Sequence, residues 1–411
     1  MSVANNSYPA NMSMIAKRLV GLSRNTLRLL PMGTTSAGPS DIIRFVLPAN
    51  CIVHLPTLAL FFTGVSSAIA QASSTAFSAM PRNIENLVQR YEVTIGGKVI
   101  TFANNSFNHL ANVVFDLTAG VDKKNNRILQ NAIGPAAAPS TADTSKLYAI
   151  QNFIGCIQSM SPEYLNTRIT GNVEVTLYMS PSNVLATGGT GVASCTYSLT
   201  NIFASVDVID IQDGVYSSLI DTYLANGGVY EYVYRNWASF SGPSSSLTAT
   251  TNFSLSTQSM NKVLCFFTEG SGNGHDATLR SSKFCQRIGD ACTHQVCVNG
   301  VLRPTYQVTS QQAFALFNNM SGHSWDLLGG SIDYLSNLDD WEKKFFCLGI
   351  QLDHNDGQFI SGLNTQGNSA ASYWQCSSTT ATSYTNVIAR VLVECTSSLL
   401  IGANRQIDVI S

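Results

Sequence analysis

A hairpin signal occurs twice in this chain, 203 residues apart, and constrains the fold more than any other feature. Residues 93–97 read Val-Thr-Ile-Gly-Gly, and residues 296–300 read Val-Cys-Val-Asn-Gly. Gly-Gly and Asn-Gly accept the positive φ angles that both central residues of a type I′ turn require, so each match predicts two antiparallel strands joined by a tight turn. The repeat indicates two copies of one β-rich unit.

Further elements recur around the two hairpins. An apolar stripe at helical spacing follows each hairpin, over residues 107–117 and 311–320. Residues 172–179 then alternate strictly between apolar and polar side chains, and residues 386–395 open with the same Asn-Val and alternate in the same way. We interpret strand, hairpin, crossing helix and terminal strand as the shared order, with 172–179 and 386–395 ending the two halves.

The boundary between the halves is predicted at residues 186–191, Ala-Thr-Gly-Gly-Thr-Gly, which are typical of a flexible linker. An alternating strand over 197–211 would then open the second half. The predicted fold class is all-β, two tandem eight-stranded jelly rolls with short helices in the loops and an N-terminal helical arm. The predicted organisation is an arm over 1–40, a first roll over 41–190 and a second roll over 191–411.

Composition agrees with this fold and narrows the function. Only 12% of the 411 residues are charged and 45% are hydrophobic, which favours short strands and a surface largely covered by protein contacts. A net charge of −2 gives the whole chain no attraction to nucleic acid or anionic membranes. The ten cysteines are widely spaced, so most are expected to be reduced, buried thiols. We predict no transmembrane segment and no secretory signal.

Four segments resemble the double jelly-roll major capsid proteins of the lineage that links tailless membrane-containing phages, adenoviruses, virophages and polinton-like viruses. They are residues 43–48 with the apolar strand that follows, residues 84–90 before the first hairpin, residues 172–185, and residues 197–207. The resemblance implies a structural protein of the virion shell. It implies a homotrimer that forms a pseudo-hexagonal capsomer and contacts neighbouring capsomers, penton proteins and minor capsid proteins.

The N-terminal arm is predicted to be a basic amphipathic helix. Ile15, Leu19, Leu22 and Leu29 lie near helical spacing over residues 13–30. The basic residues among them are Lys17, Arg18, Arg24 and Arg28. The resemblance places this arm on the inner capsid face, where it would contact a neighbouring capsomer, an internal membrane or the genome. The alternative is a terminal helix that docks on its own first roll.

One group of residues has the chemistry of a metal site. Zinc would take three thiolates and an imidazole from Cys285, Cys292, His294 and Cys297. Their spacing is not that of a common zinc finger, so buried or loop thiols are the favoured interpretation, and a disulfide within the group is a further alternative.

No sequence motif indicates an enzyme. The six histidines never form His-x-His, and neither Gly-x-Ser-x-Gly nor His-Glu-x-x-His occurs. We therefore predict no catalytic residues, no resident metal and no cofactor. The alternative function is a carbohydrate-binding spike or lectin-like protein that would use Tyr230, Tyr232, Tyr234 and Trp237 as a sugar platform. The competing interpretation of these aromatic residues is a core or a subunit interface.

Overall fold

A computed structural model describes residues 22–410 of the chain, with internal gaps. The gaps are residues 72–74, 102–105, 119–143, 190–191, 212–213, 244–246, 269–274, 277–280, 283, 286–291, 322–340, 343–344, 355–359, 368–369, 380–386 and 403–404. Within the described part, no helix is both long and apolar enough to span a bilayer.

The first half of the chain forms two facing sheets from eight main strands. In chain order these strands are β1 (Leu22–Leu29), β2 (Ile42–Val46), β3 (Ile52–Ala70), β5 (Val88–Ile95), β6 (Lys98–Val99), β7 (Lys146–Ile150), β9 (Val173–Met179) and β11 (Val192–Ile211). One sheet has the order β1-β11-β3-β7 and the other β2-β9-β5-β6. Every neighbouring pair in these sheets is antiparallel.

The second half repeats this arrangement. Its eight main strands are β12 (Tyr230–Pro243), β13 (Thr248–Asn252), β14 (Met260–Thr268), β18 (Thr293–Val298), β19 (Val301–Leu302), β21 (Leu348–Gln351), β22 (Tyr373–Ser377) and β23 (Ile388–Ile401). One sheet joins β12, β23, β14 and β21 in that order, and the other has the order β13-β22-β18-β19.

Numbering the main strands from one to eight within each half gives the same two sheets twice, 1-8-3-6 and 2-7-4-5. This order is that of a jelly roll, so the chain is a double jelly roll, as its sequence predicts. Both predicted hairpins are confirmed, because Gly96, Gly97, Asn299 and Gly300 all have positive φ angles between paired strands.

Shorter elements connect and extend the rolls. The additional strands are β4 (Ala76–Ala79), β8 (Tyr164–Asn166), β10 (Ala186–Gly189), β15 (His275–Asp276), β16 (Ser281–Ser282), β17 (Phe284–Cys285), β20 (Val308–Thr309) and β24 (Ile407–Ile410). The helices are η1 (Ile84–Leu87), α2 (Phe107–Asn112) with its π-helical continuation η2 (Val113–Thr118), α4 (Cys156–Ser159), α5 (Thr167–Thr170), η3 (Ser182–Val184), α6 (Gly214–Ala225) and α7 (Ser310–Ser321). The two predicted crossing helices are therefore confirmed as α2 with η2 and as α7.

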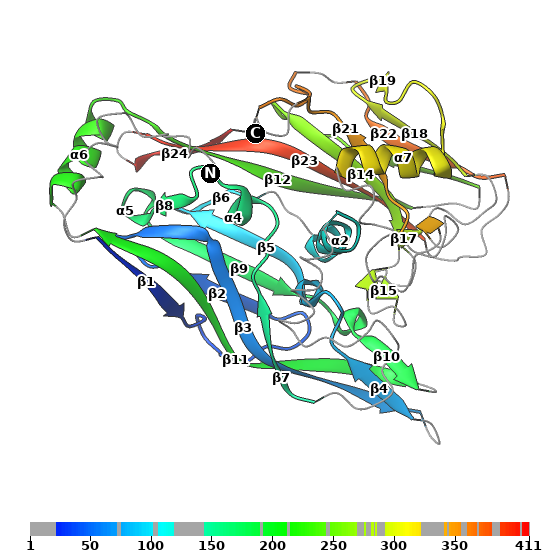
Figure 1. The fold of residues 1–411 in the computed structure, drawn as a ribbon, viewed down its shortest axis with the longest axis horizontal. Coiled ribbons are helices and arrows are strands. Elements are labelled where there is room, and N and C mark those ends of the chain that lie inside the picture. Colours follow the sequence, from blue (N-terminus) through cyan, green and yellow to red (C-terminus); the bar gives the residue numbers. More distant parts are fainter. Residues whose placement is uncertain are drawn as a thin grey trace.

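The position of the boundary between the rolls differs from the prediction. Residues 186–189 form β10, which pairs with β4, and are not a free linker. Strand β11 was expected to open the second roll, but it lies between β1 and β3 as the eighth strand of the first. The helix α6 follows β11 and leads to β12, and Figure 1 shows it at one end of the molecule.

The proposed equivalence of residues 172–179 and 386–395 is also wrong. Strand β9 is the seventh strand of its roll and corresponds to β22, whereas β23 is the eighth strand and corresponds to β11. Alternation between apolar and polar residues reports that a strand has one buried face, but it does not report the neighbour with which that strand pairs.

Candidate functional site

Each roll completes the hydrophobic core of the other. The core of the first roll includes five buried side chains from the second, namely Tyr232, Tyr234, Leu399, Ile401 and Ile407. The core of the second roll includes Leu110, Val113 and Leu117 from α2 and η2 of the first. Figure 1 shows α2 at the junction, below β14 and beside β5. The two rolls therefore form one packed body.

Polar contacts bind the same junction. The hydroxyl of Tyr234 on β12 donates to the carbonyl of Ile100 at 2.6 Å, after the first hairpin. The backbones of Ser161 and Val233 hydrogen-bond to each other in both directions. At Gly96, a Cβ would collide with Ile407 on β24, so this glycine both allows the turn and lets the second roll approach.

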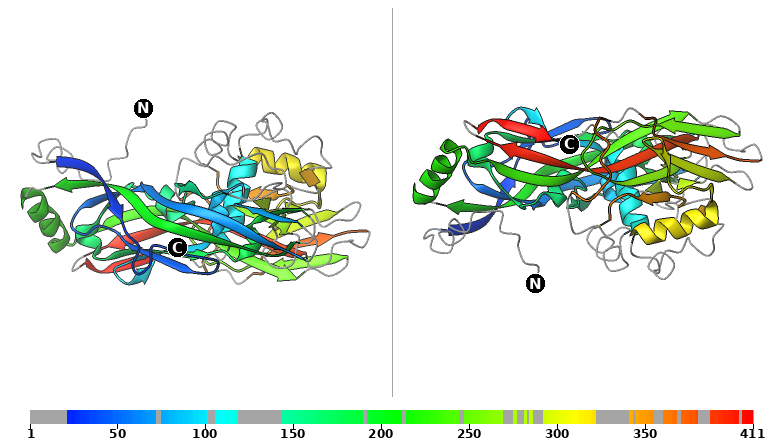
Figure 2. Two further views of the ribbon diagram at one scale, coloured as in Figure 1. Left: turned by 90° about the horizontal axis from the view of Figure 1, so that it is seen from below. Right: turned by 90° about the horizontal axis from the view of Figure 1, so that it is seen from above.

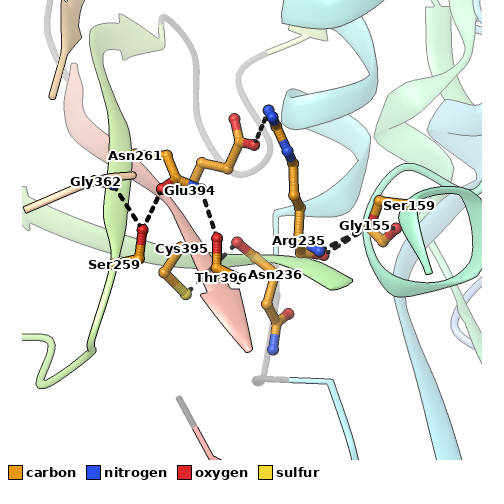
Figure 3. Close-up of polar contacts among 10 residues, drawn as sticks. All are labelled: Gly155, Ser159, Arg235, Asn236, Ser259, Asn261, Gly362, Glu394, Cys395 and Thr396. Atoms are coloured by element: carbon orange, nitrogen blue, oxygen red, sulfur yellow. Dashed lines mark hydrogen bonds and ion pairs between the residues drawn. The ribbon is translucent and has the colours of Figure 1, made fainter. Parts of the chain in front are cut away.

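An ion pair lies beside this junction, as Figure 3 shows. The Arg235 guanidinium donates to the Glu394 carboxylate at 2.8 Å across β12 and β23. Burial raises the pKa of Glu394 above its ordinary value, although the charges of Arg235 and Lys262 oppose this shift. The backbone N–H of Arg235 also donates to Ser159 Oγ of α4 in the first roll, at 2.8 Å.

A set of hydrogen bonds lies next to this pair in the second roll. Asn261 donates to Thr396 at 3.0 Å, and Ser259 donates to Asn261 at 2.8 Å. The backbone N–H of Gly362 in turn donates to Ser259 at 2.9 Å (Figure 3). Since these groups satisfy one another in a buried place, the network holds β23 to β14 and to the segment at Gly362.

The basic residues of the N-terminal arm divide into two groups. Lys17 and Arg18 lie outside the described residues. Arg24 and Arg28 lie on β1, so the predicted helix is wrong over residues 22–29. Arg24 pairs with Asp207 at 2.6 Å, and the Arg28 guanidinium lies 4.1 Å from the centre of the Phe203 ring. Leu27 and Leu29 lie on the opposite face of β1 from Arg24 and Arg28 and pack against the core. This alternation of inward and outward side chains is the sequence pattern that indicates a strand.

The structure separates two of the four residues considered as possible zinc ligands. His294 and Cys297 lie three residues apart on β18, and side chains at odd spacing on a strand point to opposite faces. His294 points inward and stacks on Phe346, with ring centres 4.8 Å apart, while the Cys297 thiol donates to the carbonyl of Ala371. Cys292 is buried, and the structure describes only the backbone of Cys285. Among the side chains that are described, no three metal-binding groups converge.

The buried cysteines follow the sequence prediction. Of the nine cysteines whose side chains the structure describes, seven are buried, the exceptions being Cys51 and Cys195, and no two of the nine form a disulfide with each other. Burial raises the pKa of Cys156 to about 12, so this thiol stays protonated and unreactive at neutral pH.

Three of the four aromatic residues of the proposed sugar platform are packed inside the protein. Tyr232 and Tyr234 belong to the core of the first roll, and Trp237 belongs to that of the second. The fourth, Tyr230, is half-buried and packs against the core of the first roll. A sugar platform needs exposed aromatic faces, so this set does not form one. Their burial at the junction between rolls is the competing interpretation of the sequence.

Comparison with solved structures supports the fold, whereas no family model and no curated protein matches the sequence. PBCV-1 VP54, as fitted into a reconstruction of the virophage Sputnik, matches 95% of this chain and 97% of its own at 12% identity and a TM-score of 0.62. The Faustovirus major capsid protein matches 97% of this chain and 92% of its own at 10% identity, with a TM-score of 0.54. A structure of the Sputnik virophage matches 95% and 88% at 10% identity, with a TM-score of 0.56. The chain therefore has the double jelly-roll fold that these viral proteins share, over nearly its whole length.

Proposed function

We propose that this chain is the major capsid protein of an icosahedral virus. Three copies form a trimeric capsomer with a pseudo-hexagonal outline, because three subunits with two similar rolls each present six similar units around one axis. The observation that carries this proposal is the repeated sheet order, 1-8-3-6 and 2-7-4-5, in two rolls packed into one body. The likeness to the Faustovirus major capsid protein supports it.

The role is structural and not catalytic. A shell subunit needs a rigid shape and contact area, and the buried junction supplies the rigidity. The partners in this proposal are other copies of the chain, neighbouring capsomers, and the penton and minor capsid proteins of the virion. A carbohydrate-binding role is not supported, since three of the four aromatic residues that suggested it are buried and Tyr230 packs against the core.

Purified protein tests the proposal. Light scattering coupled to gel filtration should give a mass three times that of the 44.2 kDa chain, and electron microscopy should show particles with a hexagonal outline. A monomer or dimer across the accessible concentration range would exclude the capsomer.

The inner-face contact of the arm is a second part of the proposal. Of its four basic residues, Arg24 and Arg28 already contact Asp207 and Phe203. Lys17 and Arg18 therefore supply the attraction to lipid phosphate or genome. Trimers should float with anionic vesicles, and Lys17→Ala with Arg18→Ala should abolish flotation while Arg24→Ala should not. Equal flotation of all variants would exclude the lipid contact.

A further inference from the structure

Arg390 places a positive charge at the junction of the two rolls. It lies on β23, opposite Phe266 of β14, on the outer face of the second roll. Phe266 is fully buried and the Arg390 side chain is only partly exposed. A guanidinium is not deprotonated in proteins, so this face holds a cation that water does not fully surround.

Two hydroxyl groups bind the guanidinium, one from each roll. Arg390 Nε donates to Thr268 Oγ1 at the end of β14, at 3.0 Å. Arg390 Nη1 donates to Ser106 Oγ, directly before α2 of the first roll, at 3.2 Å. A hydroxyl oxygen accepts a hydrogen bond but brings no negative charge. Because a guanidinium has more N–H donors than these two bonds use, part of its planar fork remains available for a further acceptor.

No carboxylate balances this charge among the residues that the structure describes. The other arginine of the junction, Arg235, has the carboxylate of Glu394 at 2.8 Å. Burial lowers the pKa of Arg390 to about 10, whereas a neighbouring carboxylate would raise it. Arg390 therefore stays charged at neutral pH, and a charge that is partly buried without a partner is costly unless an anion accompanies it.

The groups around Arg390 favour a tetrahedral anion. Ser241 of β12 is paired with Arg390 across the strands, so both side chains lie on the same face, and Ser241 is exposed. Its hydroxyl can donate beside the available N–H groups of the guanidinium. Donors that approach from separate directions match the oxygen atoms of phosphate, whereas a planar carboxylate needs only the fork of one arginine.

We propose that Arg390, Ser241 and Thr268 bind phosphate at the junction between the rolls. The phosphate supplies the counter-charge of Arg390 and so holds the segment before α2 against the second roll. The site lies within one chain, so this proposal does not depend on the capsomer and adds a ligand to it.

Thermal unfolding of the full chain with phosphate tests the site. Phosphate at about 10 mM, with the ionic strength held constant by sodium chloride, should raise Tm by about 2 °C. Arg390→Met should abolish this rise, because methionine replaces the apolar stem but carries no charge. Arg44→Met is the matched control, since Arg44 lies 3.8 Å from Glu174 on the surface, and this variant should keep the full rise.

Two milder variants separate phosphate binding from a merely structural role. Ser241 is exposed, so Ser241→Ala should leave Tm without phosphate unchanged but reduce the rise that phosphate causes. Arg390→Lys keeps the charge but loses the planar fork, so it should weaken phosphate binding by about tenfold.

Equilibrium dialysis against radiolabelled phosphate measures the binding directly. We expect a single phosphate per unmodified chain, and none in Arg390→Met. The absence of bound phosphate in the unmodified chain would overturn the proposal. So would an equal rise of Tm in the unmodified chain and in Arg390→Met, because phosphate would then act through the solvent. If Arg390→Met does not fold, unchanged phosphate binding in Ser241→Ala and Arg390→Lys would overturn the proposal instead.

Discussion

The two rolls have the same sheet order but different surroundings. The outer sheet face of the second roll is covered at Arg390 by the segment before α2 and at Gly349 by α7, whereas that of the first roll exposes Ile69 and Leu147. The left view of Figure 2 shows β3 and β11 of this first sheet side by side. The crossing helices show the reverse difference. All described residues of α2, in the first roll, are buried, whereas α7, in the second roll, exposes Gln312, Ala315 and Asn319. Burial therefore depends on which roll comes next and not on the jelly-roll topology. Four predictions test how far the two rolls behave as one unit.

Removing equivalent core rings should have the largest effect. Phe62→Ala in β3 and Phe267→Ala in β14 should each destabilise the protein by about 3–5 kcal/mol, because both rings are fully buried. All four tryptophans lie in the second half, so fluorescence reports that roll while circular dichroism reports both. If the shared cores make the rolls one cooperative unit, both signals should shift together in guanidinium for either variant. A fluorescence midpoint that Phe62→Ala leaves unchanged would mean that the rolls unfold separately.

Breaking the ion pair at the junction should come next. Arg235→Met leaves the Glu394 carboxylate buried without its partner and should cost about 3 kcal/mol in urea denaturation. Replacing both residues, by Arg235→Met with Glu394→Leu, should cost less. Arg44→Met is the control in the first roll, because Arg44 lies 3.8 Å from Glu174 on the surface and should contribute at most about 1 kcal/mol. Equal losses for Arg235→Met and Arg44→Met would contradict a special role for the buried pair.

Acid should weaken the second roll through His294. Burial lowers the pKa of His294 to about 3, and neither ring nitrogen has a hydrogen-bond partner among the residues that the structure describes. Between its ordinary pKa of about 6.5 and about 3, the unfolded chain binds a proton that the folded chain does not, so stability falls as pH falls. His294→Phe should remove about 1.4 kcal/mol per pH unit from that slope. His54→Gln is the control, and an unchanged slope in His294→Phe would refute the assignment.

Deleting one hydroxyl at the junction should have the smallest effect. Tyr234→Phe removes the hydrogen bond to Ile100 between the rolls and should cost about 1 kcal/mol. Tyr178→Phe removes a 2.9 Å bond to Glu92 within the first roll and serves as the comparison. The tyrosine between rolls should affect both spectroscopic signals. A loss confined to circular dichroism would argue against coupling through this bond.

Local patterns predicted the repeated elements of this fold well. The Gly96-Gly97 and Asn299-Gly300 turns and the crossing helices follow from residues close together in sequence, because turn chemistry and helical spacing act locally. The strand over 197–211 was also found, but its roll was not. Which sheet a strand joins is decided by partners far away, as when β1 pairs with β11 about 180 residues later.

The junction between the rolls was missed for the same reason. The alternation of Tyr230, Tyr232 and Tyr234 predicted a strand, but nothing in the sequence states that their buried face completes another roll's core. Arg235 and Glu394 carry no motif and meet only when β12 pairs with β23. The segment that contains Arg24 and Arg28 fits both a helical spacing and the period of two of a strand. Pairing with β11 makes it a strand.

The exchange of core residues bears on synthesis at the ribosome. Ile401 and Ile407 arrive about 190 residues after β11, yet they fill the first roll. When only the first half of the chain has left the ribosome, the first roll lacks part of its core. Its apolar interior therefore stays exposed to solvent until the last strands leave the exit tunnel. The first roll can therefore complete its core only when synthesis is nearly finished. Until then, an incomplete chain exposes apolar residues that are buried in the finished subunit.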